Sequence, residues 1–241
     1  MHESAPYPDT TVIVNCAGRT RSIIGCQSLR NAGIPNPVMA LKDGTMGWHL
    51  AGLQLEHGGT RTPPNPSPDA LKRAKAHAAD VAKRFGVKSV DAKTLDAWRA
   101  ERDSRALFVI DVRTPEEYEA GHLPDARWAP GGQLVQATDQ YIGIRNARVV
   151  LVDNDGVRAT MTAHWLVQMG GYDVHVLKDG LTGATLTKGP DPNIVLGLDK
   201  ASVETVGPYA IEDMQTRDEC VIVDLEPSIS YRNGHVPGAW C

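Results

Sequence analysis

The sequence predicts an α/β fold, built on parallel sheets, that occurs in tandem copies along the chain. Short apolar segments of the kind that form buried parallel strands alternate with segments of helical spacing. The order strand, loop, helix, strand recurs, which is the pattern of a βαβ unit. Long stretches of the chain also match one another, and such internal repeats indicate duplicated structural units.

The first βαβ unit lies near the N-terminus. The apolar segment 11–16 predicts a buried parallel strand, and residues 22–34 show helical spacing that ends at an Asn-Ala-Gly stop. Residues 37–41 predict a second strand, which a Lys-Asp-Gly turn follows. We therefore expect a strand, a loop, a helix and a parallel strand in this order.

A linker and a helix separate this unit from the next. Residues 57–69 are rich in Pro and Gly, as linkers are. Ser67 and Pro68 have the residue types of an N-cap and a first helical position, so we expect a helix over about 68–85. Its apolar stripe is weak, which predicts a connector that lies on a surface.

Strands and helices alternate again from residue 87. The expected elements are strands at 89–90, 106–112, 149–153 and 173–177, a helix from the Asp91 cap to about 102, and a helix over about 157–170. This alternation predicts a parallel sheet flanked by helices.

Two internal repeats define the domain organisation. Residues 12–44 match residues 149–180, with one residue more in the first copy, and both end on Lys-Asp-Gly. Residues 89–128 align without a gap onto residues 202–241, and both contain Gly-His-x-Pro. The chain thus contains one whole unit at about 87–190, with half-units before and after it.

The motifs within these units resemble those of the rhodanese family of sulfurtransferases. Asp-Val-Arg, Glu-Tyr and Gly-His-Leu-Pro within 111–124 resemble the signature of the first half of a rhodanese domain. The segment Cys16–Ser22 resembles the active-site loop, and Lys42–Trp48 resembles the closing motif. The resemblance implies a rhodanese-like parallel sheet in tandem copies, as in a fragment of a tandem multi-rhodanese protein.

The repeats and the resemblance together predict the following division of the chain. It comprises the second half of a rhodanese domain at 1–57, a linker and connector helix at 58–86, a complete domain at 87–190, and the first half of a further domain at 191–241. Because a half-domain alone exposes strand edges, we expect the last part to dock on the first, within one chain or in a homodimer.

Cys16 is the predicted sulfur carrier of the first half-domain. The resemblance implies that its thiolate takes a sulfane sulfur from thiosulfate or a similar anion and passes it, through a persulfide, to cyanide or a thiol. A free thiol has a pKa of about 8.5, so loop amides at the helix N-terminus and nearby cations must favour the anion. The predicted anion-binding loop is Ala17, Gly18, Arg19, Thr20, Arg21 and Ser22.

Other interpretations of these residues stay open. Cys16 could be a buried structural thiol, and either Arg19 or Arg21 could be a solvated surface charge. Asp224 is a candidate support of the loop, but Glu226 stands where the complete domain has Arg113.

The complete domain is predicted to be catalytically silent. Asp153 stands where the first copy has Cys16, and a carboxylate cannot carry a persulfide and repels an anionic donor. Ala184 stands where the closing motif has Trp48. We expect this domain to serve packing, spacing or recognition.

Two further functions compete with sulfur transfer. Phosphatases and arsenate reductases of this fold hold an oxyanion in a Cys-x5-Arg loop, whereas Cys16 and Arg21 are spaced as Cys-x4-Arg. A rhodanese-like binding or regulatory module without catalysis is the alternative that the silent domain favours.

Composition excludes several other classes of function. The formal net charge of -4 argues against nucleic-acid or membrane partners, and no apolar run is long enough to span a bilayer. The four cysteines lack C-x-x-C spacing, and the histidines lack metal-ligand spacing. We expect a cytoplasmic protein with reduced thiols, no metal and no cofactor, since the chemistry runs through the thiol alone.

Overall fold

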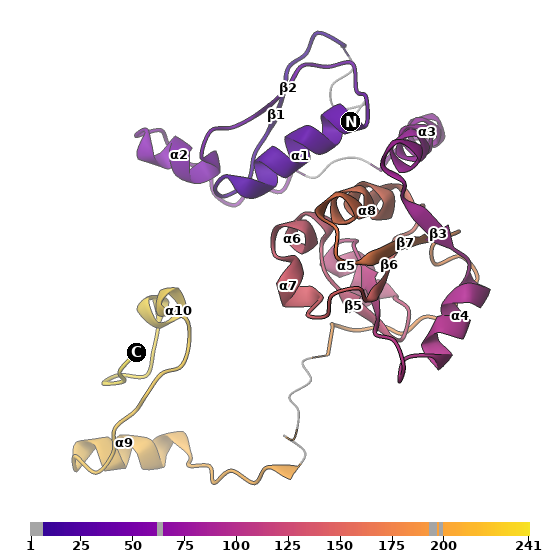
Figure 1. The fold of residues 1–241 in the computed structure, drawn as a ribbon. Coiled ribbons are helices and arrows are strands. Elements are labelled where there is room, and N and C mark those ends of the chain that lie inside the picture. The colour runs from indigo at the N-terminus through magenta and orange to yellow at the C-terminus, as the bar shows by residue number, and fades with distance from the viewer. Residues whose placement is uncertain (1–6, 62–64, 193–196, 198–199) are drawn as a thin grey trace. The chain divides into compact units, whose positions relative to one another are not determined.

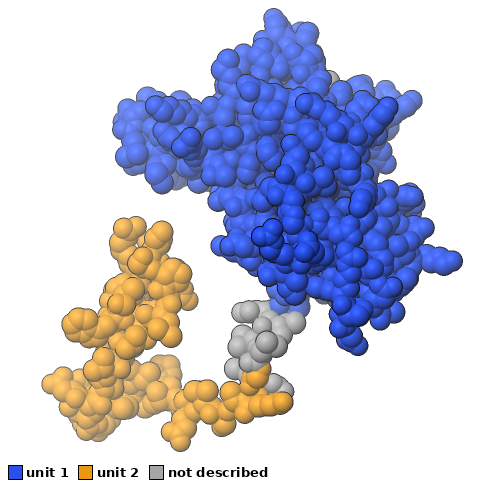
Figure 2. Space-filling model, viewed as in Figure 1, with its two compact units in different colours: residues 1–192 blue, residues 193–241 orange. Residues whose placement is uncertain are grey.

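The computed structural model describes residues 7–61, 65–192, 197 and 200–241. The chain divides into two units, residues 1–192 and residues 193–241, which Figure 2 distinguishes by colour. Each unit is described by itself below.

A five-stranded sheet forms the centre of the complete domain (Figure 1). Its strands are β3 (Lys88–Val90), β4 (Leu107–Asp111), β5 (Ala126–Trp128), β6 (Arg148–Val152) and β7 (Asp173–Leu177). They lie in the order β3-β7-β6-β4-β5, and every neighbouring pair is parallel. This confirms the α/β fold that the alternating pattern predicts.

Helices cover both faces of this sheet. They are α4 (Ala92–Ala100), α5 (Pro115–Ala120), α6 (Gly131–Gln136), α7 (Thr138–Tyr141) and α8 (Val157–Met169). Successive residues of β6 point to opposite faces, because the side chains of a strand alternate. Val149 and Leu151 pack with residues of α6, α7 and α8, whereas Val150 and Val152 pack with Leu95 of α4.

The connector helix α3 (Pro68–Phe85) has the bounds that the sequence predicts. The Ser67 hydroxyl accepts a hydrogen bond from the Ala70 amide at 3.3 Å, and Pro68 takes the first helical position. The helix packs against α8 and buries Ala78 and Val81. The expectation of a weak apolar stripe is wrong: the buried and half-buried residues of α3 recur at helical spacing along one side, and this side covers part of the domain.

The first half-domain contains β1 (Val12–Val14), α1 (Thr20–Asn31), β2 (Val38–Ala40) and α2 (Gly44–Leu50). The two strands are parallel, as predicted. The sequence predicts a buried strand here, but one face of the β1–β2 pair is open to solvent, since Ile13 of β1 and Met39 of β2 are each 54% exposed. Among the described residues β1 pairs with β2 alone, whereas the matching strand β6 pairs with both β4 and β7.

Helix α1 of the first half-domain packs against the complete domain. Ile24 packs against the core that contains α6 and α8. The Trp165 indole donates to the Ser28 hydroxyl at 2.8 Å, and the Asn31 amide lies 3.1 Å from Nε2 of His164. Residues on both sides of the linker thus share one packed unit.

The second unit repeats local features of the complete domain. It contains α9 (Pro208–Thr216) and α10 (Ser228–Asn233). The rings of Tyr231 and His235 stack at 3.8 Å, as do those of Tyr118 and His122 in the complete domain. The segment that matches β4 forms a single bridge, from Val223 to Trp240, in place of a strand ladder.

Candidate active site

The Cys16 loop connects β1 to α1. Cys16 is half-buried, and its thiol donates to the Ser22 hydroxyl with Sγ 3.4 Å from Oγ. Ser22 is 1% exposed, and its own hydroxyl donates to the Arg19 carbonyl at 2.9 Å. The first turn of α1 therefore fixes the hydroxyl beside the sulfur.

The surroundings of Cys16 favour its thiolate. The Ser22 hydroxyl is the largest cause that lowers the pKa of the Cys16 thiol, and the backbone of Ser22 and Gly18 and the charge of Arg21 lower it further. Partial burial opposes them, but the pKa remains below its usual value. Hydrogen bonds and positive charge stabilise a thiolate in this way at reactive cysteines.

The start of α2 holds the loop through its backbone. The Thr45 amide donates to the Cys16 carbonyl and the Met46 amide to the Ala17 carbonyl, each at 2.9 Å. Gly44 has φ +59°, and a Cβ there would lie 2.2 Å from the carbonyl oxygens of Cys16 and Gly18. A residue with a side chain does not fit at Gly44 without moving the loop.

Sequence reasoning placed Gly44 in a turn and did not assign it to the site. The repeated Lys-Asp-Gly was the available signal, because Gly180 occupies the same position in the complete domain. It has φ +54°, and a Cβ there would lie 2.3 Å from the Asp153 carbonyl oxygen. The two loops are thus supported in the same way.

Asp153 occupies the loop of the complete domain with its own carboxylate. The side chain is buried and accepts from the Gly156 amide at 2.6 Å and the Ala159 amide at 3.1 Å. Burial is the largest effect and raises the pKa of the Asp153 carboxyl, while these amides lower it. Two loop amides are therefore already bonded to an internal carboxylate.

The arginine of this second loop is also paired within the domain. Arg158 donates to both carboxylate oxygens of Glu117, at 2.6 and 2.9 Å. This interaction is the main cause that lowers the pKa of Glu117 to about 2. The charge of Arg158 is therefore neutralised by a neighbouring carboxylate, which weakens its attraction for an external anion.

A buried ion pair positions the loop between β4 and α5. Arg113 is 5% exposed and Asp111 is fully buried, with Nη2 of Arg113 2.7 Å from Oδ2 of Asp111. Arg113 also donates to the Asn154 side chain at 2.9 Å and to the Gly121 carbonyl at 2.6 Å. One side chain thus links β4, the α5 end and the Asp153 loop.

The second unit repeats only part of this arrangement. Asp224 accepts from the Glu226 amide at 2.8 Å, as Asp111 accepts from the Arg113 amide at 3.0 Å. Glu226 cannot supply the guanidinium that Arg113 supplies. The proposed support of the Cys16 loop by Asp224 stays a prediction.

Other thiols and possible ligands lie apart from this chemistry. Cys26 is buried in α1, and its thiol donates to the Val38 carbonyl at 3.6 Å, which indicates a structural role. Within the described ranges no group of three or more His, Cys, Asp or Glu side chains could hold a metal ion. No helix of the described part is long and apolar enough to cross a bilayer.

Comparison with known proteins identifies the family of the chain. Residues 91–186 match the rhodanese-like domain. The uncharacterized protein YqhL of Bacillus subtilis (strain 168) is 35% identical over 89 residues, which cover 36% of this chain and 68% of that protein.

A solved structure matches nearly the whole chain. The thiosulfate sulfurtransferase from Pseudomonas aeruginosa is 51% identical, with a TM-score of 0.82 over 99% of this chain and 45% of that chain. This chain therefore spans less than half the length of that protein. The likeness covers residues of both units of the structure. The chain belongs to the rhodanese family.

Proposed function

We propose that this chain is a sulfurtransferase of the rhodanese type, with Cys16 as the sulfur carrier. The observation that carries the proposal is the Cys16 loop, in which a hydroxyl, backbone amides and Arg21 lower the thiol pKa at a half-exposed sulfur. The similarity to a thiosulfate sulfurtransferase supports the same reaction class.

The proposed reaction has two displacement steps at sulfur. The Cys16 thiolate attacks the sulfane sulfur of thiosulfate, the S–S bond breaks, and sulfite leaves with the bonding electrons. Cyanide or an acceptor thiolate then attacks the outer sulfur of the persulfide. The acceptor leaves as thiocyanate or as a new persulfide, and Cys16 is released as a thiolate, so that electrons and charge balance over the cycle.

The residues of the loop have distinct parts in this proposal. When Cys16 is deprotonated, the Ser22 hydroxyl turns from the Arg19 carbonyl to donate to the sulfur. With the backbone of Gly18 it then stabilises the negative charge before attack and after release. Arg21 adds a full positive charge that also attracts an anionic donor. The amides of Thr45 and Met46 hold the loop carbonyls in place, and the missing side chain of Gly44 leaves room for this close approach.

The complete domain, whose loop carries Asp153 and which is called the Asp153 domain from here on, has no corresponding chemistry, and we propose that it is not catalytic. Its loop amides are bonded to an internal carboxylate, and its arginine is paired with Glu117. This supports a packing or recognition role for that domain beside a catalytic Cys16 half-domain.

A turnover assay tests the proposed activity. With thiosulfate and cyanide, the chain is expected to form thiocyanate, and Cys16→Ser to reduce the rate to the uncatalysed background. Cys26→Ser, ten residues further along the chain, is the matched control and should keep the rate because that thiol is buried in α1. Equal activity of the two variants would contradict the role of Cys16.

The same samples separate sulfur transfer from oxyanion chemistry. A phosphatase assay with p-nitrophenyl phosphate and an arsenate reduction assay should give no Cys16-dependent rate, because the loop is one residue shorter than Cys-x5-Arg. Cys16-dependent phosphate release without thiocyanate formation would favour the hypothesis that the chain is a phosphatase.

Removal of the Ser22 hydroxyl should raise the pKa of the Cys16 thiol. That hydroxyl is the largest cause of the lowered pKa, so Ser22→Ala should move the alkylation midpoint of Cys16 to higher pH. At a fixed pH below the midpoint, the thiolate fraction falls about tenfold for each unit of pKa. Iodoacetamide labelling of the Cys16 peptide, followed by mass spectrometry across pH, measures this shift.

Ser28→Ala is the control for this measurement. Ser28 lies on the same helix, and its hydroxyl accepts from Trp165 and not from Cys16. The variant should keep the midpoint of the unaltered chain. If Ser22→Ala leaves the alkylation midpoint of Cys16 unchanged, the Ser22 hydroxyl does not stabilise the thiolate.

A further inference from the structure

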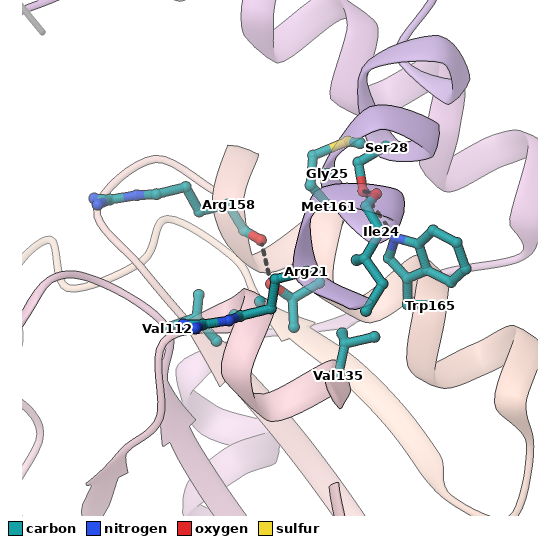
Figure 3. A pocket seen from close by; sticks show the side chains of 12 residues that line it. Arg21, Ile24, Gly25, Ser28, Val112, Val135, Arg158, Met161 and Trp165 are labelled. Atoms are coloured by element: carbon teal, nitrogen blue, oxygen red, sulfur yellow. Dashed lines mark hydrogen bonds between the residues drawn. The ribbon is translucent and has the colours of Figure 1, made fainter. Parts of the chain in front are cut away.

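A cavity of about 290 Å³ lies where α1 of the Cys16 half-domain meets α6 and α8 of the Asp153 domain (Figure 3). Its volume is near the lower end for small-molecule sites in proteins. The cavity is separate from the sulfur atom of Cys16 but shares Arg21 with the Cys16 loop. Both copies of the repeated unit therefore contribute to its wall.

Most of the wall is apolar. Ile24 from α1, Val135 from α6, and Met161 and Trp165 from α8 line it. The Trp165 indole nitrogen is already hydrogen-bonded to Ser28, so it requires no partner from a ligand. An apolar body in this space would replace water against apolar side chains, which is favourable.

Two arginines line the same cavity, and Figure 3 shows them extending to the side away from Trp165. Arg158 is paired with both oxygens of Glu117. Arg21, by contrast, makes no hydrogen bond or ion pair among the described residues, and its charge acts only through space on the Cys16 thiol. An unpaired guanidinium beside an apolar wall favours a ligand with an anionic head.

We propose that this cavity binds a small organic carboxylate whose apolar body contacts Ile24, Val135 and Trp165 and whose carboxylate pairs with Arg21. An inorganic anion would leave the apolar wall in contact with water, and a neutral apolar molecule would leave Arg21 unpaired. At the packing density of protein interiors, the volume accommodates about ten non-hydrogen atoms.

The proposed site gives the Asp153 domain a recognition role. Helices α6 and α8 form most of the wall, so the bound carboxylate contacts the catalytically silent domain and the Cys16 loop together. Binding draws the charge of Arg21 towards the carboxylate and thereby couples ligand occupancy to the Cys16 loop. The binding itself requires no sulfur transfer, and the two proposals can therefore fail separately.

Octanoate, with ten non-hydrogen atoms, is a suitable probe, and titration calorimetry measures its binding to the full chain. We expect one octanoate per chain, with octan-1-ol at least tenfold weaker and acetate without measurable binding. Octanol bound as tightly as octanoate, or no binding of octanoate, would overturn the proposal.

Two variants locate the ligand. Arg21→Gln should weaken octanoate binding at least tenfold and leave octanol unchanged, while Arg19→Gln, the control in the same loop, should keep octanoate binding. A Cβ on Gly132 meets nothing within 4 Å, so Gly132→Leu should fill the cavity and weaken both ligands. Unfolding midpoints confirm that the variants fold. Octanoate binding that neither substitution changes would place the ligand elsewhere and contradict the proposal.

Discussion

Gly44→Ala is expected to abolish sulfur loading of Cys16. The new Cβ would lie 2.2 Å from the carbonyl oxygens of Cys16 and Gly18, which are backbone atoms that cannot move aside without reshaping the loop. The positive φ of Gly44 adds strain of about 1–2 kcal/mol for a residue with a side chain. The amides of Gly18 and Ser22 would then no longer surround the sulfur. Thiocyanate formation and the alkylation midpoint of Cys16 measure the loss.

Gly33→Ala is the matched control for this prediction. Gly33 has φ +72°, but a Cβ there meets nothing within 4 Å. It should lower the free energy of unfolding slightly and leave Cys16 reactive. Equal loss of activity in both variants would mean that backbone strain, and not the close approach to the loop, explains the effect.

Arg113→Met is expected to have the largest effect on stability. The substitution removes the partner of a fully buried carboxylate and the donors to Asn154 and Gly121. Loss of one member of a buried ion pair costs about 3–5 kcal/mol, because the other charge remains without compensation. Urea unfolding followed by tryptophan fluorescence should show this decrease in the transition of the complete domain.

Arg127→Met provides the comparison on the surface. Arg127 pairs with Asp191 at 2.9 Å, but its side chain is 61% exposed. An exposed pair contributes about 0–1 kcal/mol, so the midpoint should change little. A similar decrease of the unfolding midpoint in both variants would show that burial does not determine how much the ion pair of Arg113 and Asp111 contributes to stability.

Regular elements with strong local patterns were predictable from the sequence. The apolar runs of β6 and β7 predict buried parallel strands, and the structure confirms this, since side chains of these strands pack into a core on each face of the sheet. Ser67 and Asp91 predict helix starts, and both side chains accept from an amide of the first turn. These features depend on residues close in the sequence.

Elements that depend on distant partners were not predictable in the same way. Helices α6 and α7 and strand β5 are short, and their apolar residues are held by α8 and β4. The exposure of Ile13 also differs from expectation, because burial of a strand depends on neighbours that an apolar run does not reveal.

The candidate site shows the same distinction. The Cys16 loop was recognisable from its order of residues between a strand and a helix. The approach of Gly44 to that loop and the position of Arg21 in a shared cavity are tertiary features. The docking of residues 191–241 on residues 1–57, and the role of Asp224 within it, stay predictions.

The intact mass of the chain after incubation with thiosulfate tests the central claim most directly. The account predicts a gain of one sulfur atom that cyanide removes and that Cys16→Ser lacks while Cys26→Ser retains. A folded chain that gains no sulfur, or gains it equally in Cys16→Ser, would contradict the assignment of Cys16 as the sulfur carrier.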